Sequence, residues 1–401
     1  MGWAARLTAL GAVSGTALAV ASGAAGWHTA HRILAAVALP PLAALVATAW
    51  VTARRLLPAA VAALVLFGVA ALLTVRGVHL AFAALAFAAT AYLAAVVFRS
   101  TTVVAGQQLP FDNSYRGAAR DYVTLTKPRI MSLLLLTGGA GTFVGARGLP
   151  SAGIFVATML GLALACGGAS ALNHYLDRDI DRLMGARTEG RPVASGRLPA
   201  PRALEFGLAL SAASFALLDS LVNPPTALLA LAGNLFYVLV YTRWLKRSTA
   251  QNIVIGGAAG AVPPLVGFAG STGHLGWAAL AMFVVVFVWT PPHFWALALM
   301  IKEHYRRAGV PMLPVTRGDR ETARQILWYT ALLFAVTLVP AALGVFGVVY
   351  TVSAALLGGV FAWYALELRR SLERRAAVRL FHYSLLYLAL LFVAMAVDMV
   401  I

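Results

Sequence analysis

Apolar residues run in long blocks along this chain, and thirteen blocks approach the length of a membrane span. A helix needs about 20 residues to cross the hydrocarbon core of a bilayer. The blocks therefore predict an all-α, polytopic integral membrane protein. Four of them precede residue 100, at 7–26, 33–53, 56–75 and 78–98. The other nine lie at 130–147, 152–174, 203–222, 226–242, 252–270, 276–300, 325–344, 347–366 and 380–400.

A polar stretch from Arg99 to Lys127 divides the two groups of blocks. We expect a four-helix transmembrane extension over 1–100, a polar linker or surface helix over 101–126, and a nine-helix domain over 127–401. The opening residues, with Arg6 and later small residues, also match a signal peptide. An even number of extension helices keeps the N-terminus on the side that the charges favour, so we expect a helix there instead.

The composition agrees with a membrane protein. Hydrophobic residues make up 61% of the chain and charged residues 11%, and the mean hydropathy is +0.83. This leaves too little polar surface to cover a core of this size in water, so a water-soluble enzyme is excluded. The one cysteine, Cys166, lies in an apolar block and allows no intramolecular disulfide.

The chain is strongly basic, with 31 Lys and Arg against 14 Asp and Glu and a net charge of +17. Such a balance could indicate a nucleic-acid partner, but after Lys127 the basic residues gather in alternate inter-helix segments. One side holds Arg178, Arg182, Arg187, Arg191, Arg197, Arg202, Arg243, Lys246, Arg247, Lys302, Arg306, Arg307, Arg317, Arg320, Arg324, Arg369, Arg370, Arg374, Arg375 and Arg379, and the other side holds Arg147. By the positive-inside rule, the side that is rich in Lys and Arg is cytoplasmic. We therefore expect a multi-pass protein of a prokaryotic cell membrane with no nucleic-acid partner.

Acidic residues are few, yet three of the 14 lie within five positions. Asn173, Asp177 and Asp181 are spaced four apart, so on a helix they form a ladder on one face, while Asp179 points away. Like charges one turn apart repel, and carboxylate and amide oxygens suit Mg²⁺, which shares substrate phosphates. With arginines in the following loop, the ladder indicates a diphosphate site at the cytoplasmic helix end. The alternative is a solvated helix end whose acids pair with Arg178 and Arg182.

The spacing of Asn173, Asp177 and Asp181 is similar to the first aspartate-rich motif of the UbiA superfamily of intramembrane prenyltransferases, whose members have nine transmembrane helices. Within the superfamily the chain resembles the protohaem IX farnesyltransferase (haem O synthase) family over about 121–401. The stretches that carry this resemblance are 126–129, 241–257, 289–299 and 308–314. Other superfamily members have a second aspartate motif where this chain reads YTRWLKRSTAQN, and a segment without acids is typical of haem O synthases.

The resemblance implies transfer of a farnesyl group from farnesyl diphosphate to a vinyl group of haem B. Mg²⁺ and cations would assist loss of diphosphate, and an allylic carbocation would form. The resemblance implies that Asn173, Asp177 and Asp181 hold Mg²⁺ and are catalytic, together with Lys246. The residues that it places near the substrates are Lys127, Arg129, Arg187, Arg191, Tyr241, Arg247 and Asn252.

Trp289, His293 and Trp295 lie near the cytoplasmic end of a block whose double proline at 291–292 is expected to kink the helix. A kink opens space, and the resemblance makes His293 and Trp295 candidates for substrate contact, with His293 near the haem iron. The alternative is a set of interfacial aromatic residues. Glycines over 256–260 indicate close helix packing rather than a phosphate loop, because they lie within an apolar helix.

The extension carries His31 and His79 at similar depth on the predicted extracytoplasmic side. Two imidazoles that face each other across a four-helix bundle can ligate one haem iron. The surrounding residues also resemble half of a haem A synthase, a family that takes haem O as its substrate. This implies a haem in the extension or docking to a haem A synthase, and the alternative is a pair of interfacial histidines.

Two other functions fit a membrane protein with this motif. The same chemistry could act on a quinone or chlorophyll precursor, although the TPPHFW stretch argues against that acceptor. A polytopic transporter would show inverted repeats and midplane charges in broken helices. The carboxylates gather instead at one face, which favours the prenyltransferase.

Overall fold

The computed structural model describes residues 115–401, and this part of the chain is helical throughout. The expected four-helix extension over 1–100, with His31 and His79, lies outside the described residues, as do residues 101–114 of the expected linker. Residues 115–126 form the helix α5 (Tyr115–Thr126).

Nine helices of the described part are long and apolar enough to cross a membrane, which confirms the nine predicted blocks. They are α6 (Pro128–Ala146), α7 (Ala152–Leu176), α9 (Ala200–Leu221), the continuous span 224–248, the span of α12 (Asn252–Gly260) and α13 (Val262–Thr272), α14 (Trp277–Met300), α17 (Gly318–Ala342), α18 (Val348–Ser371) and α19 (Arg374–Asp398). The span 224–248 consists of α10 (Pro224–Leu235), the π-helix η3 (Phe236–Leu245) and α11 (Lys246–Ser248).

Local chemistry explains where several helices begin. The Ser151 hydroxyl accepts a hydrogen bond from the backbone N–H of Ile154 and caps α7, and the Asn223 side chain caps α10 through the N–H of Thr226. Pro128 and Pro224 occupy first-turn positions, where a proline N–H is not needed. These caps place the start of the fourth span at Pro224, two residues before the predicted block.

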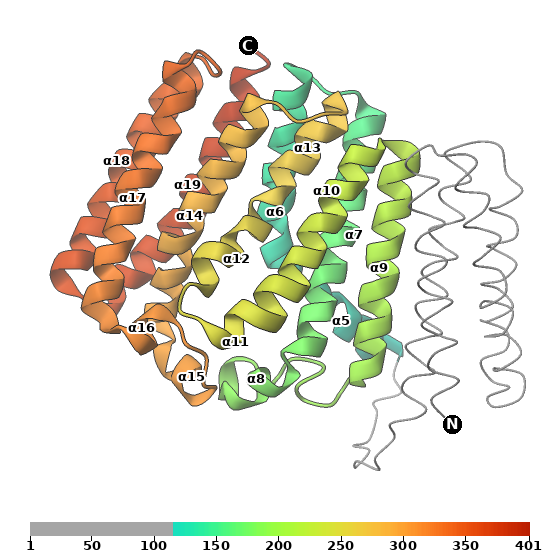
Figure 1. Cartoon of the computed structure of the whole chain (residues 1–401), viewed down its shortest axis with the longest axis vertical. Helices are drawn as coiled ribbons and strands as arrows, with labels where there is room; N and C mark the ends of the chain where they lie inside the picture. The colour runs from blue at the N-terminus through green and yellow to red at the C-terminus, as the bar shows by residue number, and fades with distance from the viewer. Residues whose placement is uncertain (1–114) are drawn as a thin grey trace, which may run out of the picture.

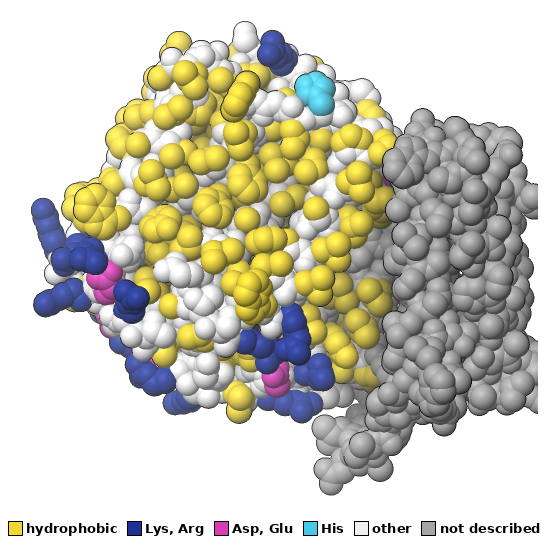
Figure 2. Space-filling model, in the orientation of Figure 1, with side chains coloured by type: hydrophobic (Ala, Val, Ile, Leu, Met, Phe, Trp, Pro, Cys, Tyr) yellow, Lys and Arg dark blue, Asp and Glu magenta, His cyan; other side chains and the backbone are white. Residues whose placement is uncertain are grey.

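Consecutive spans run in opposite directions, so alternate connections lie at the same end of the bundle. Figure 1 shows α8 (Arg178–Leu183), α15 (Lys302–Arg307) and α16 (Leu313–Thr316) together at one end, and the C-terminus at the other. We call the first of these the motif end, because α7 reaches it with Asn173. Figure 2 shows a broad hydrophobic band across the bundle, with Lys and Arg gathered mainly toward the motif end of this face.

Glycines let α6 and α13 pack backbone to backbone. A Cβ atom added at Gly267 would lie 1.8 Å from the carbonyl oxygen of Gly138, and one at Gly141 would lie 2.4 Å from that of Pro264. At Gly256 a Cβ would lie 2.3 Å from the ring of Tyr241, which confirms the predicted close packing in this glycine run. The approach brings the span of α12 and α13 against the helices that carry the acidic motif.

Candidate functional site

The acidic motif lies where α7 ends and α8 begins. Asp177 is the residue between the two helices, with φ −89° and ψ 5°. The ladder was predicted on one uninterrupted helix, and the structure carries it on two. The backbone nevertheless keeps its helical bonds, from the N–H of Asp177 to the oxygen of Asn173 and from the N–H of Asp181 to the oxygen of Asp177, each 2.8 Å. The four-residue spacing is therefore preserved, and all three side chains are buried.

Cations from distant parts of the chain contact this motif. The Lys246 ammonium lies 2.5 Å from Asp177 Oδ2, and the Lys127 ammonium donates to Asn173 Oδ1 at 2.8 Å. Arg191 donates to both carboxylate oxygens of Asp181, at 2.8 and 2.9 Å. The three motif residues thus each have a basic partner at the motif end.

The arginines next to the motif in sequence are not its partners. Arg178 donates to the backbone oxygen of Tyr175, and Arg182 to that of Ala194. Asp179 points to Arg247, which binds both its carboxylate oxygens at 2.6 and 2.7 Å. The alternative of a helix end neutralised by adjacent arginines is therefore wrong in its partners.

The π-helix η3 lies beside the acidic motif and contains the first part of the YTRWLKRSTAQN segment. Thr242 Oγ1 accepts a hydrogen bond from Asn173 Nδ2 at 3.2 Å, and Lys246 follows η3 directly. Tyr241 stacks on Tyr237 with ring centroids 5.5 Å apart. Wider helical turns of this kind are frequent at functional sites, and they shift side chains relative to an α-helix. Here η3 presents a hydroxyl and an ammonium to the acidic motif.

Burial and neighbouring charges shift the pKa values of the charged groups of this cluster that lie outside the spans. Burial, together with Arg191 and Lys246, lowers the pKa of Lys127 to about 7. Burial raises the pKa of Asp181 against the opposing effect of Arg191. The hydrogen bond from Arg247 holds the pKa of Asp179 well below its usual range. Basic side chains outnumber acidic ones in this cluster, and this excess favours the binding of an anion.

The oxygen atoms of the motif fit Mg²⁺. Asp177 Oδ1 is buried and accepts no hydrogen bond, and the nearest cation recorded for it is Arg247, at 3.8 Å. Within 115–401 no three His, Cys, Asp or Glu side chains form a ready-made metal site. Two carboxylates and one amide match Mg²⁺, which commonly takes one or two carboxylates and completes its shell with water and substrate phosphates.

Other predicted site residues lie farther out or are occupied elsewhere. Arg129 and Arg187 are exposed, and no hydrogen bond or ion pair in the described part joins them to the acidic motif. Asn252 is buried at the start of α12, where its amide donates to the backbone oxygen of Thr249 and its Oδ1 has no partner.

The aromatic residues of α14 face two different neighbours. His293 lies between Trp289 and Phe381, with ring centroids 4.4 and 4.8 Å away, and its Nδ1 is 2.7 Å from Ser384 Oγ. Trp295 packs instead edge-on against Tyr329 of α17. The helix continues through Pro291 and Pro292 as one element. His293 is thus fixed against α19, on a different side of the helix from Trp295.

Some residues near the motif carry no signal that the sequence analysis used. Thr242 bonds Asn173, and Tyr237 lies four residues before Tyr241 on the same face of η3. Tyr305, in α15, has its pKa raised by burial, while Lys246, Arg187 and Arg191 act to lower it. The spacing of Tyr237 and Tyr241 is the one signal that could have identified a member of this group.

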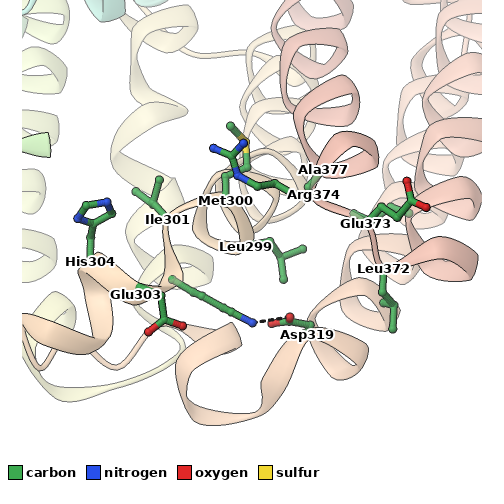
Figure 3. Close-up of a pocket in the computed structure, with 12 residues that line it drawn as sticks. Leu299, Met300, Ile301, Glu303, His304, Asp319, Leu372, Glu373, Arg374 and Ala377 are labelled. Atoms are coloured by element: carbon green, nitrogen blue, oxygen red, sulfur yellow. Dashed lines mark hydrogen bonds and ion pairs between the residues drawn. The ribbon is translucent and has the colours of Figure 1, made fainter.

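A separate cavity of about 380 Å³ lies among the motif-end termini of α14, α18 and α19 (Figure 3). Lys302 and Asp319, both lining residues, form an ion pair with 2.6 Å between Nζ and Oδ2. His304, also on its wall, is 2.7 Å through Nδ1 from the backbone oxygen of Met184. None of the lining residues belongs to the acidic motif.

The sequence has close relatives of known name. A model of the UbiA prenyltransferase family matches residues 134–393. A Protoheme IX farnesyltransferase from Symbiobacterium thermophilum is 56% identical over 281 residues, which are 70% of this chain and 94% of that protein. One from Roseiflexus sp. (strain RS-1) is 53% identical over 282 residues, 70% of this chain and 53% of that protein. The chain therefore spans about half the length of the Roseiflexus relative.

Solved structures share the fold at low sequence identity. A digeranylgeranylglyceryl phosphate synthase has a TM-score of 0.59 and 17% identity, covering 70% of this chain and 98% of that one. A UbiA homolog from Archaeoglobus fulgidus bound to DMAPP and Mg²⁺ has a TM-score of 0.53 and 18% identity, covering 69% and 99%. Together with the family match and the similarity to named relatives, this places the chain in the UbiA prenyltransferase family, on the branch of the protoheme IX farnesyltransferases.

Proposed function

We propose that this protein transfers the farnesyl group of farnesyl diphosphate to a vinyl group of haem B and so makes haem O. The observation that carries the proposal is the buried cluster in which Asn173, Asp177 and Asp181 meet cations. Carboxylate and amide oxygens beside Lys and Arg suit a Mg²⁺–diphosphate group. The acceptor is proposed from the names of the relatives that share more than half of the aligned residues.

In the proposed reaction, the C1–O bond of farnesyl diphosphate breaks and both electrons leave with the diphosphate oxygen. The terminal vinyl carbon of haem B forms a bond to C1 of the allylic carbocation. Water then adds to the cation left on the neighbouring carbon and loses a proton. Lys127, Arg191 and Lys246 bind the diphosphate and stabilise the charge that it gains.

Bound to Asn173, Asp177 and Asp181, Mg²⁺ would supply further charge neutralisation for the departing diphosphate. Arg129 and Arg187 lie at the rim and would attract the anion as it approaches. Tyr241, Arg247 and Asn252 would shape the site around the allylic end. His293 would contact the porphyrin, whereas Trp295, on another side of α14, would support that helix from its contact with Tyr329.

We also propose that the motif end faces the cytoplasm of a prokaryotic cell. The positive-inside rule supports this, because Lys and Arg gather at the motif end while the opposite connections of the described part carry Arg147. A membrane-impermeant thiol reagent should label an Arg307→Cys variant in inverted vesicles and an Arg147→Cys variant in right-side-out ones. The reverse pattern would refute the orientation.

For the residues before the described part, the proposal rests on sequence. Residues 1–100 would form a four-helix extension in which His31 and His79 ligate one haem iron, and the extension would dock a haem A synthase. The full-length His31→Ala and His79→Ala variants should each lose bound haem absorbance that the parent protein shows. Equal absorbance in all three proteins would refute the ligation.

The activity is tested on membranes that contain the full chain. They are incubated with haem B, farnesyl diphosphate and Mg²⁺, and the extracted haems are separated and weighed by mass spectrometry. We expect a haem that has gained a farnesyl group and a hydroxyl group. Absence of this product, while a known enzyme makes it in parallel, would refute the proposal. A parallel incubation with a quinone precursor in place of haem B tests the other acceptor.

A further inference from the structure

One buried histidine beside the acidic motif has no partner. The side chain of His174 is 2% exposed, and neither ring nitrogen makes a hydrogen bond. Buried polar groups in proteins nearly always have a partner, and the exceptions are often functional. The mechanism above does not use this residue.

The position of His174 on α7 points to the same site. It follows Asn173 directly and precedes Asp177 by three residues, a spacing that puts two helical side chains on neighbouring positions of one face. Asn173 is bonded to Lys127 and Asp177 to Lys246, and His174 stands between these two motif residues in the chain. The buried imidazole therefore lies beside the same cluster.

The groups around His174 indicate which hydrogen-bond partner its ring lacks. A neutral imidazole has one N–H donor and one acceptor nitrogen, whereas Lys and Arg side chains only donate. The acceptor nitrogen can be satisfied by an ammonium group, but the N–H needs an oxygen acceptor. Within the described part, no side-chain or backbone oxygen accepts from it. An anion with several oxygens that enters the ring of cations would supply that acceptor.

We propose that His174 donates its ring N–H to a phosphate oxygen of the diphosphate substrate and is therefore a further substrate-binding residue. This inference rests on the proposed function. Because the phosphate oxygens gain charge as the C1–O bond breaks, the hydrogen bond strengthens in the transition state. His174 should thus affect both substrate affinity and turnover.

The test compares three full-length variants in membranes. His174→Phe keeps a ring of similar size and removes the donor, His174→Gln restores an N–H donor, and His274→Phe is the matched control. His274 is exposed at the end of the bundle opposite the motif. We expect His174→Phe to lower kcat/KM for farnesyl diphosphate by about 10- to 100-fold with an unchanged KM for haem B. His174→Gln should recover about tenfold, and the control should match the parent protein.

A binding experiment separates this inference from the proposed function. Calorimetry with inorganic pyrophosphate and Mg²⁺ on purified protein should show weaker binding to His174→Phe than to the parent, at similar melting temperatures. If both proteins bind pyrophosphate equally, the inference is wrong. If Gln and Phe variants are equally poor and both melt earlier, the role is structural and the inference is also wrong. A parent protein that makes no farnesylated haem, yet needs His174 to bind pyrophosphate, would refute the acceptor and support the inference.

Discussion

The ammonium of Lys246 lies 2.5 Å from Oδ2 of Asp177, although 69 residues separate them in the chain. The Lys246 side chain is 11% exposed and that of Asp177 0%. Removing one partner of a buried ion pair leaves an uncompensated charge and costs about 3–5 kcal/mol. The pair therefore links the end of α7 to the end of η3, and both stability and chemistry depend on it.

Lys246→Met should lower the free energy of unfolding by about 3–5 kcal/mol, because Asp177 stays buried without its partner. The double variant with Asp177→Asn should recover most of this loss, since neither partner then leaves an uncompensated charge, while farnesyl transfer stays absent. Unfolding curves and activity are measured on the same purified samples. Lys302→Met is the control, because its ion pair with Asp319 is about one-third exposed and should contribute less than about 1 kcal/mol. A double variant as unstable as Lys246→Met would contradict the prediction.

Asp177 and Asp179 should differ in activity although both are acids of the same motif. Asp177→Asn removes a proposed Mg²⁺ ligand and should lower haem O formation by about 100-fold or more. Asp179 is 58% exposed and bound to Arg247, so Asp179→Asn should change the rate only a few-fold. Product formation at saturating farnesyl diphosphate is the measurement. Similar losses in the two variants would refute the assignment.

Mg²⁺ should bind weakly until diphosphate is present, because the motif offers two carboxylates and one amide. Calorimetric titration of the full chain with Mg²⁺ should show much tighter binding when inorganic pyrophosphate is included, since the phosphate oxygens complete the coordination shell. EDTA should abolish farnesyl transfer, and added Mg²⁺ should restore it. Tight Mg²⁺ binding without pyrophosphate would contradict this dependence.

His293 should affect the haem substrate rather than the prenyl donor. His293→Phe should raise the KM for haem B several-fold and leave that for farnesyl diphosphate unchanged. Ser384→Ala should have a smaller effect in the same direction, because it frees the imidazole from its contact at 2.7 Å. His382→Phe serves as the control, since His382 is exposed on α19. An unchanged KM for haem B in the His293→Phe variant would refute the proposed contact between His293 and haem B.

Gly267→Ala should destabilise the bundle by about 1–3 kcal/mol, because its Cβ would meet the backbone of Gly138 and force α6 and α13 apart. Gly359→Ala in α18 is the matched variant, since beyond the backbone of its own helix and its chain neighbours no atom lies within 4 Å of the added Cβ. That change should be neutral or slightly stabilising. Thermal unfolding of the two purified variants decides, and equal melting temperatures would contradict the prediction.

The nine spans could be predicted because a membrane helix depends on local composition alone. Their ends were less predictable: caps such as Asn223 and the start of α17 at Gly318 lie outside the apolar blocks. The π-helix was not predicted, since nothing in the apolar pattern distinguishes it from an α-helix. Its wider turns are observed only once the chain is folded.

The candidate site, too, could be predicted only in part from the sequence. The spacing of Asn173, Asp177 and Asp181 is local and was found from the sequence, but their cationic partners come from tertiary packing. Arg178 is adjacent to Asp177 and still donates elsewhere, while Lys246 reaches it from another helix. The roles of these residues remain predictions, and their proximity is the structural finding.

The π-helix η3 makes its segment tolerant of a change in length. An α-helix turns about 100° per residue, and a π-helical segment holds extra residues within a similar number of turns. Deleting one residue between Phe236 and Leu245 would therefore let part of the segment return to α-helical winding with little change in its total rotation. Lys246, which follows η3, would stay near Asp177. The side chains within η3, such as Thr242 beside Asn173, are the ones that such a deletion would move.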